Sequence, residues 1–317
     1  DYAGEVDPPA CAPSTGKKIA VLGGGPGGLS AAYYLQLMGH QATVYEMLPK
    51  LGGMLRYGIP NYRLPKERLD DDINAILKTG VDVKYGLKIG QDISIQDLRD
   101  QYDAVLITIG ASTDKKLGLE GEDADGILSA VQFLRNVGKQ EIMDLTGKQV
   151  AVIGGGNVSM DAVRTAKRLG AEKVSIVYRR RVADMTALPD EIEGAVAEGI
   201  ELQTLKAPAS LDVNENHHIR GIYVTPQMVS AIKNGRASIR PTGEEDIYIP
   251  CDVLIVAIGQ NIETKHFEEA GIPVERGKIV TKSTGAFENM PGVFAGGDCA
   301  SGPASVIKAI AAAKVVA

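Results

Sequence analysis

The sequence predicts an α/β protein that contains the same parallel-sheet unit twice, and three observations support this. Residues 17–28 align without a gap on residues 148–159, and each stretch contains a glycine-rich loop. In both copies a short β-branched, apolar run leads into the loop and a helix-compatible segment follows it. Both copies close on nearly identical apolar runs, 104–110 and 252–259, that end in glycine. We therefore expect two Rossmann-like dinucleotide-binding domains.

Length, composition and charge agree with a globular protein of about two domains. The chain has 317 residues, of which 44% are hydrophobic and 23% charged, and its net charge is −6. An acidic balance argues against nucleic acid or an anionic membrane as the main partner. No apolar run approaches the roughly 18 residues that a membrane helix needs, and the first residues lack the features of a signal peptide. We expect a cytoplasmic location and, because the first residue is not Met, a longer or processed parent chain.

The spacing of the cysteines and histidines in the sequence is not that of a metal site or of a redox-active cysteine pair. The three cysteines, Cys11, Cys251 and Cys299, are far apart, and no Cys-x-x-Cys pair occurs. The four histidines do not cluster with cysteines or acids at ligand spacing. A disulfide framework, a zinc site and a dithiol centre are therefore disfavoured, and we expect no bound metal.

The loop glycines have separate physical roles. Gly23 and Gly154 permit the tight turn out of the strand, and Gly25 and Gly156 let a pyrophosphate approach the backbone. Gly28 allows the helix to pack closely on the strand. The N-terminus of the following helix then offers unpaired N–H groups and a positive dipole end to the phosphates.

The end of the second strand distinguishes the two copies. Glu46 follows Val44-Tyr45, whereas Arg179, Arg180 and Arg181 follow Val177-Tyr178. A carboxylate accepts hydrogen bonds from ribose hydroxyls, whereas arginines pair with a 2′-phosphate. The third glycine is also replaced, by Ser159, in the second copy. The first copy is therefore interpreted as an FAD site and the second as an NADPH site. The alternative for the arginines is a solvated basic edge.

The order of the motifs predicts a split first domain. Residues 1–15 are expected to form a tail or linker, because they are rich in Pro, Ala and acids. Residues 16–115 and 260–317 are expected to form a discontinuous FAD-binding domain. Residues 116–259 are expected to form an NADPH-binding domain inserted into it.

Asp298 follows the apolar stretch Val293-Phe-Ala and two glycines, and it can be interpreted in two ways. It can be a surface turn acid, or a carboxylate at the end of a buried strand that holds a ribityl hydroxyl of flavin. The apolar residues before it favour the second interpretation. Pro303 is expected to open an Ala-rich helix, whose dipole would direct positive charge at the flavin.

Three segments carry a resemblance to a known family. The most specific is Gly52-Gly-Met-Leu-Arg-Tyr-Gly-Ile-Pro-Asn-Tyr-Arg-Leu-Pro65, and the others are the second loop, 154–161, and the segment 302–306. With these segments the chain resembles the glutamate synthase small (β) subunit family over residues 14–317. This family includes the NADPH-side half of dihydropyrimidine dehydrogenase and the NADPH-dependent ferredoxin oxidoreductases. The family usually carries a cysteine-rich iron–sulfur domain before the first loop, and only the tail with Cys11 precedes it here.

The resemblance implies two sets of cofactor-binding residues and no catalytic side chain, because the cofactors carry the chemistry. The FAD set is Gly23, Gly25, Pro26, Gly27, Gly28, Glu46, Gly53, Arg63, Gly110, Gly297, Asp298, Ser305 and Val306. The NADPH set is Gly154, Gly156, Asn157, Val158, Arg179, Arg180, Ala257 and Gly259. Asp298 and Ser305 are in addition candidates for tuning the flavin.

The expected function is hydride transfer from NADPH to FAD, followed by electron transfer to an iron–sulfur partner. The resemblance implies either the large subunit of glutamate synthase or a ferredoxin as that partner, in the second case with possible electron bifurcation. A non-catalytic subunit that binds both cofactors, and a diaphorase acting on a free small molecule, stay open. Disulfide reductases are disfavoured because no Cys pair is present; Cys299 is interpreted as a lone buried thiol. Baeyer–Villiger monooxygenases are disfavoured because the chain has no Trp.

Overall fold

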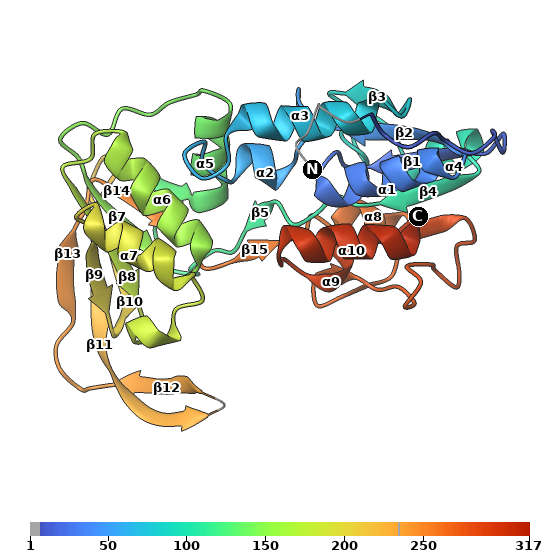
Figure 1. The fold of residues 1–317 in the computed structure, drawn as a ribbon. Coiled ribbons are helices and arrows are strands. Elements are labelled where there is room, and N and C mark those ends of the chain that lie inside the picture. The colour runs from blue at the N-terminus through green and yellow to red at the C-terminus, as the bar shows by residue number, and fades with distance from the viewer. Residues whose placement is uncertain (1–6, 234) are drawn as a thin grey trace. The chain divides into compact units, whose positions relative to one another are not determined.

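The computed structural model describes residues 7–233 and 235–317, which divide into two compact units (Figure 1). The first unit comprises the chain up to Tyr57, Asn61–Thr113 and Gln260–Ala317. The second comprises Gly58–Pro60 and Asp114–Gly259. Part of the expected tail, residues 1–6, lies outside the described residues, and residues 7–17 form neither helix nor strand.

The first unit is built on a five-stranded parallel sheet of order β18-β4-β1-β2-β3. Its strands are β1 (Lys18–Leu22), β2 (Gln41–Glu46), β3 (Asp82–Tyr85), β4 (Ala104–Ile107) and β18 (Val293–Ala295). Its helices are α1 (Pro26–Leu37), α2 (Met54–Tyr57), α3 (Lys66–Leu77), α4 (Ile95–Gln101), α8 (Lys265–Glu269), α9 (Asp298–Ser301) and α10 (Val306–Val316). The short strands β16 (Val274–Glu275) and β17 (Lys278–Ile279) pair with each other.

The second unit repeats this sheet, in the order β6-β14-β7-β8-β9. Its strands are β6 (Ile127–Ser129), β7 (Gln149–Ile153), β8 (Lys173–Tyr178), β9 (Glu201–Thr204) and β14 (Val253–Val256). Its helices are α5 (Ala130–Gly138), α6 (Asn157–Arg168), the 3-10 turn η1 (Val182–Asp184) and α7 (Pro189–Ala197). Where the chain passes from the first unit to the second and back, β5 (Thr113–Asp114) pairs with β15 (Gln260–Asn261).

An antiparallel sheet is added to the second unit between β9 and β14. It consists of β10 (Lys206–Val213), β11 (Ile219–Lys233), β12 (Arg236–Pro241) and β13 (Ile247–Pro250). The first half of the long strand β11 pairs with β10 and β13, and its second half pairs with β12. Residues 227–233 and 235–241 thus form a hairpin, called here the β11–β12 hairpin, which extends beyond the other strands of its unit in Figure 1.

The two parallel sheets share one strand order, so the expected fold class, two Rossmann-like units in an α/β protein, is confirmed. β1, β2, β3 and β4 correspond to β7, β8, β9 and β14. The outer strand beside β4 or β14 has a different origin in each unit. In the first unit it is β18, from the C-terminal part of the chain; in the second it is β6, which precedes the rest of its sheet.

A carboxylate joins the starts of corresponding strands in both units. Asp103 accepts a hydrogen bond at Oδ2 from the backbone N–H of Lys18 at 2.9 Å. Asp252 does the same for the N–H of Gln149 at 2.8 Å. In each unit the N–H of the aspartate also donates to the carbonyl of that same partner residue. The two aspartates therefore fix the same register between the central strand and its neighbour.

Apolar side chains pack on both faces of each sheet. In the first unit one cluster lies around Leu22 and Phe267 and the other around Leu35 and Leu106. In the second unit one cluster lies between the sheet and its helices, and another lies between the parallel and antiparallel sheets around Leu254. Strands buried on both faces explain why these segments are continuous apolar runs in the sequence.

The last helix begins later than the sequence analysis expected. Pro303 lies outside α10, which starts at Val306 with Ser305 as its N-cap residue. Gly302, at φ +88°, ends the short helix α9 and turns the chain before Pro303. Across residues 7–233 and 235–317, no helix combines the length and apolar character that crossing a membrane requires.

Replacing a central core residue should destabilise the protein. Leu254→Ala removes a side chain with no exposed surface from the sheet of the second unit. We expect the free energy of unfolding to fall by about 2–5 kcal/mol, because a cavity is left in a two-sided core. Urea denaturation followed by circular dichroism measures this change. The control is Ile307→Ala, at a residue 78% exposed, where a change beyond about 0.5 kcal/mol would contradict the assignment of exposed and buried positions.

Candidate functional site

The first glycine loop brings helix α1 close to the ends of β1 and β4. Gly23 has φ +105°, and a Cβ on it would lie 2.7 Å from the carbonyl oxygen of Thr108. A Cβ on Gly28 would clash with the carbonyl oxygen of Gly23 and lie 2.7 Å from Thr108 Oγ1. The Thr108 hydroxyl donates to the carbonyl of Leu22 at 3.0 Å, at the end of β1. Only glycine fits at position 28, because a Cβ there would meet both the Gly23 carbonyl and the Thr108 hydroxyl.

The second loop meets the same constraint with different residues. Gly154 has φ +149°, and a Cβ on it would clash with the carbonyl oxygen of Ala257. Ser159 stands where the first copy has Gly28, and it is fully buried. Its hydroxyl lies 3.5 Å from the carbonyl oxygen of Ala257. Ala257 corresponds to Thr108, so the hydroxyl that the neighbouring strand supplies in the first copy comes from the helix in the second.

Each loop leads directly into a helix with free N-terminal amides. Gly25 is the N-cap residue of α1, with Pro26 at its first position, and Gly156 is the N-cap residue of α6. Neither helix has a side-chain cap. Such uncapped N-termini combine unpaired N–H donors with the positive end of the helix dipole, which is the arrangement that binds phosphate groups.

A second chain segment folds back on each loop. In the first unit the N–H of Gly52 donates to the carbonyl of Gly24 at 2.8 Å. A Cβ on Gly53 would lie 2.8 Å from Gly25 Cα, so glycine is required there. In the second unit the N–H groups of Thr186 and Ala187 donate to the carbonyl of Gly155 at 2.9 and 3.1 Å. The specific segment 52–65 thus begins at the first loop.

Glu46 is buried beside the first loop. Its carboxylate accepts hydrogen bonds from the N–H groups of Gly24 and Leu48, both at 2.8 Å, and the residue is 5% exposed.

The strand register shows that the counterpart of Glu46 in the second unit is Tyr178, not Arg179. Leu22 and Ile153 are equivalent residues of the two central strands, and Leu22 pairs with Tyr45 whereas Ile153 pairs with Val177. The sequence comparison aligned the two tyrosines and was wrong by one residue. The turn before β8 contains one residue more than the turn before β2.

The three arginines after β8 have different environments. Arg179 is exposed, and within the described part of the chain no other side chain pairs with it. Arg180 is half-buried and donates from Nε to the carbonyl of Ala237 at 3.1 Å. Arg181 forms a two-pronged ion pair with Asp184, at 2.8 and 3.0 Å. Arg179 is therefore the arginine most available to an anionic ligand.

Asp298 opens helix α9 after Gly297, which has φ +73°. Its Oδ1 atom is buried and has no hydrogen-bond partner among the described residues. Burial raises the pKa of this carboxyl group above its ordinary value. A buried acceptor oxygen without a donor is costly to a protein alone. A ligand hydroxyl at this position, such as that of a ribityl chain, would satisfy it, so the residues fit the expected flavin.

The remaining predicted residues belong to several elements of the two units. Gly110 and Gly259 adopt positive φ at corresponding positions after β4 and β14. Asn157 accepts at Oδ1 from the N–H of Leu188 at 2.9 Å, so it anchors the segment folded onto the second loop.

The other predicted residues lie in turns and at helix starts. Arg63 lies in a turn between α2 and α3. Gly27 and Val158 belong to the first turns of α1 and α6, and Ser305 and Val306 to the start of α10.

The cysteines are free thiols, in agreement with the absence of a Cys pair from the sequence. Cys299 is fully buried and donates from Sγ to the carbonyl of Gly296. Burial raises the pKa of Cys299 to about 12 and that of Cys251 to about 12. Both thiols therefore stay protonated and unreactive at neutral pH. Among the described residues, no group of three or more His, Cys, Asp or Glu side chains could hold a metal ion.

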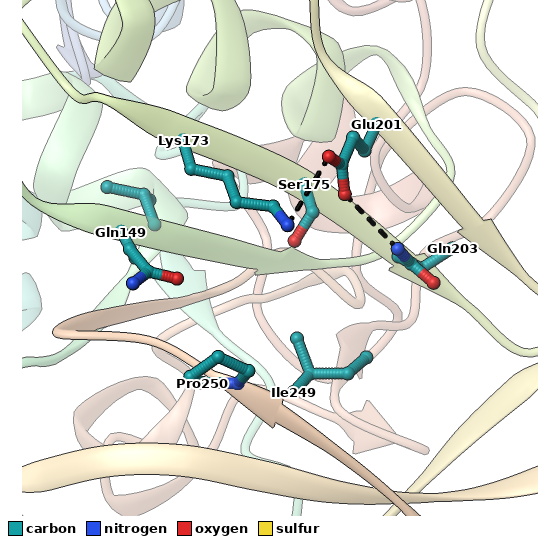
Figure 2. Close-up of a pocket in the computed structure, with 8 residues that line it drawn as sticks. Gln149, Lys173, Ser175, Glu201, Gln203, Ile249 and Pro250 are labelled. Atoms are coloured by element: carbon teal, nitrogen blue, oxygen red, sulfur yellow. Dashed lines mark hydrogen bonds and ion pairs between the residues drawn. The ribbon is translucent and has the colours of Figure 1, made fainter.

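A small hollow in the second unit lies at the opposite ends of the strands (Figure 2). Lys173 and Glu201 form an ion pair of 3.3 Å across it, and Gln203 donates to Glu201 at 3.3 Å. It is lined by Gln149, Val150, Lys173, Ser175, Glu201, Gln203, Ile249 and Pro250. Because dinucleotides bind beyond the carboxyl ends of parallel strands, this hollow is not part of the candidate site.

Three residues that shape the loops were missed by the sequence analysis. They are Thr108, Tyr178 and Asp184. The Tyr178 ring lies under Gly155, where a Cβ would be 2.6 Å from its Cε2 atom. The internal repeat offered a signal for Thr108, because it aligns with Ala257. Asp184 had no such signal, since the first copy has no counterpart to it.

Comparison with known proteins places the chain in a family. The family model described as pyridine nucleotide-disulphide oxidoreductase matches residues 17–313. The β subunit of the NADP(+)-dependent formate dehydrogenase of Moorella thermoacetica is 40% identical over 94% of this chain and 42% of its own length. The small chain of the NADPH glutamate synthase of Escherichia coli is 34% identical over 94% of this chain and 66% of its own. The chain thus spans less than two thirds of these relatives.

A solved structure has the same fold. FprA from Mycobacterium tuberculosis, in a complex with NADPH, superposes with a TM-score of 0.78 at 19% identity, over 96% of this chain and 83% of that one. The predicted relation to glutamate synthase small chains and the oxidoreductase class are confirmed. The chain belongs to the pyridine nucleotide-disulphide oxidoreductase family.

Proposed function

We propose that the chain is the NADPH-oxidising flavoprotein part of an electron-transfer enzyme of the glutamate synthase small-subunit type. Residues 16–115 and 260–317 would bind FAD, and residues 116–259 would bind NADPH. The supporting observation is the difference between the two loops. A buried carboxylate, Glu46, adjoins the first loop. Arg179, which is exposed and pairs with no side chain of the described residues, follows the strand beside the second loop.

The residues of the first unit would hold the flavin dinucleotide. The amides of α1 would bind the pyrophosphate, and Glu46 would accept hydrogen bonds from the ribose hydroxyls. Asp298 would receive a flavin-side hydroxyl at its buried Oδ1 atom, and α10 would direct its N-terminal dipole toward the ring. Bound there, FAD would supply a two-electron acceptor for the hydride of NADPH and a donor to one-electron centres.

The residues of the second unit would bind and select the coenzyme. The amides at the start of α6 would hold the pyrophosphate, and Arg179 would pair with the 2′-phosphate. Ala257 and Gly259 would line the turn beside the second loop. A negative charge at the place of Glu46 would repel a 2′-phosphate, and the second unit has the neutral Tyr178 there.

We further propose an iron–sulfur protein or subunit as the electron acceptor, and the cytoplasm as the location. The named relatives are a β subunit and a small chain of larger enzymes, which supports a partner for this chain as well. Acceptors consistent with the proposal are a glutamate synthase large subunit and a ferredoxin. The three cysteines are free thiols, and burial keeps Cys299 protonated. This supports an electron acceptor outside the chain rather than a disulfide within it.

An anaerobic titration tests the proposal. The FAD-loaded protein is titrated with NADPH, and in parallel with NADH, while the flavin absorption band is recorded. We expect bleaching by NADPH at far lower concentration than by NADH, because only NADPH offers a 2′-phosphate to Arg179. Equal bleaching by both would overturn the NADPH assignment. No bleaching by either, with both cofactors bound, would indicate a non-catalytic subunit.

Gly28→Ala should prevent FAD binding while Ser159→Ala should not. The added methyl group in the first loop would clash with the carbonyl of Gly23 and displace α1, whereas Ser159→Ala only removes a weak hydrogen bond. The measurement is the flavin-to-protein ratio of the purified variants, with far-ultraviolet circular dichroism to verify folding. A folded Gly28→Ala variant with a full complement of FAD would contradict the assignment of the first loop.

Arg179→Ala should weaken NADPH binding selectively. Loss of a charge-assisted hydrogen bond to the 2′-phosphate should raise the Kd for NADPH by about tenfold or more and leave that for NADH unchanged. Isothermal titration calorimetry measures both constants. Arg99→Ala, which removes an equal charge from an exposed position on α4 of the first unit, is the control. An equal loss in both variants would mean that only the net charge matters.

A further inference from the structure

The segment after the arginines connects the second glycine loop to the β11–β12 hairpin. Asp184 lies in this segment, and its side chain has no exposed surface. Its Oδ1 atom accepts a hydrogen bond from the N–H of Ala237 on β12, at 2.9 Å. The same carboxylate forms the ion pair with Arg181. These contacts hold the pKa of Asp184 well below its usual range, so it is ionised at neutral pH.

Ala237 is held on both sides of its backbone. Its N–H donates to Asp184, and its carbonyl accepts from Arg180 Nε at 3.1 Å. Within the hairpin it is opposite Ile232 of β11. The Nε contact holds one edge of the rigid, flat Arg180 guanidinium against the hairpin backbone. The hairpin therefore restricts where the outer nitrogens of Arg180 can point.

The other end of the segment is fixed to the loop itself. The Tyr178 ring lies under Gly155, and its hydroxyl donates to the carbonyl of Asp184 at 2.8 Å. The carbonyl of Gly155 accepts from Thr186 and Ala187, and Asn157 accepts from Leu188. Hydrogen bonds, the packing of the Tyr178 ring and the short chain segment itself thus connect the second glycine loop, through Asp184, to the hairpin.

We propose that Asp184 and the β11–β12 hairpin position the arginines that recognise the 2′-phosphate, although neither touches the coenzyme. Asp184 withdraws Arg181 from the ligand and anchors Ala237, and Ala237 orients Arg180. Arg179 and the outer nitrogens of Arg180 then face the phosphate as a fixed pair. This inference rests on the proposed NADPH site and deepens it, because it makes a distant hairpin part of coenzyme selection.

A charge-neutral double variant separates positioning from net charge. Asp184→Asn with Arg181→Gln removes both members of this ion pair, leaves the net charge unchanged and frees no arginine. The matched control is Asp212→Asn with Arg220→Gln, which removes an ion pair of the same two residue types from the antiparallel sheet. Binding of adenosine 2′,5′-bisphosphate and of 5′-AMP, which lacks the 2′-phosphate, is measured by isothermal titration calorimetry.

The unmodified protein should prefer the bisphosphate, and the Asp184/Arg181 variant should lose about tenfold of that preference without a change in the Kd for 5′-AMP. The control variant should keep the preference. An unmodified protein without any preference would refute the NADPH assignment itself. If the protein discriminates and the Asp184/Arg181 variant discriminates equally, or binds both ligands equally weakly, the positioning role is overturned.

Hydrogen exchange supplies a second readout that does not depend on affinity. Coupling between two sites is reciprocal, so a bound 2′-phosphate should stabilise the hairpin. In the unmodified protein the bisphosphate should slow amide exchange in residues 227–241 more than 5′-AMP does. This difference should vanish in the Asp184/Arg181 variant. Equal protection by the two ligands in the unmodified protein would contradict the coupling.

Discussion

The close approach of a helix to the ends of two parallel strands is the constraint on which both candidate sites depend. A helix can direct its amides at a ligand beyond the sheet only if its first turn reaches the strand ends. In the first unit Gly28 makes room for the Thr108 hydroxyl. In the second unit Ala257 makes room for Ser159. The two units thus differ in which element supplies the hydroxyl at this contact.

Given the same framework, the chemistry of each unit depends on what lies beside the second loop glycine. The carboxylate of Glu46 places a buried charge beside Gly24 and accepts a hydrogen bond from the Gly24 N–H. Tyr178 places an apolar ring at Gly155 and uses its hydroxyl to hold Asp184 instead. Replacing a carboxylate by a ring removes negative charge from the loop, and it also supplies a support for the arginine segment. One substitution thus changes both the electrostatics and the packing of the site.

The sequence alone predicts the architecture well because the repeat is local. Each glycine loop, its flanking strands and the apolar run ending at Gly110 or Gly259 lie in short continuous stretches, and backbone sterics leave few alternatives for them. The start of the last helix was misplaced because Gly302 turns the chain before Pro303, and the helix begins only at Val306, after its N-cap residue Ser305.

Contacts over long sequence distances could not be predicted in this way. The equivalence of Glu46 and Tyr178 depends on one extra residue in a turn, which only the strand register reveals. The partnership of Asp184 with Ala237 spans 53 residues, and no pattern in the sequence marks it. The unpaired buried oxygen of Asp298 depends on packing around α9, so the sequence could suggest a carboxylate there but not its unmet hydrogen bond.

The separate origin of the two outer strands has a consequence for biosynthesis. The second sheet is complete once β14 has emerged from the ribosome, whereas the first must wait for β18, whose sequence begins at Val293. At about 5–20 residues per second, translating the stretch between β4 and β18 takes on the order of 10–40 seconds. During that time β4 presents an unpaired edge, which is open to pairing with other chains. The inserted unit can thus fold first, while the unit that surrounds it in the sequence is the one in need of protection during synthesis.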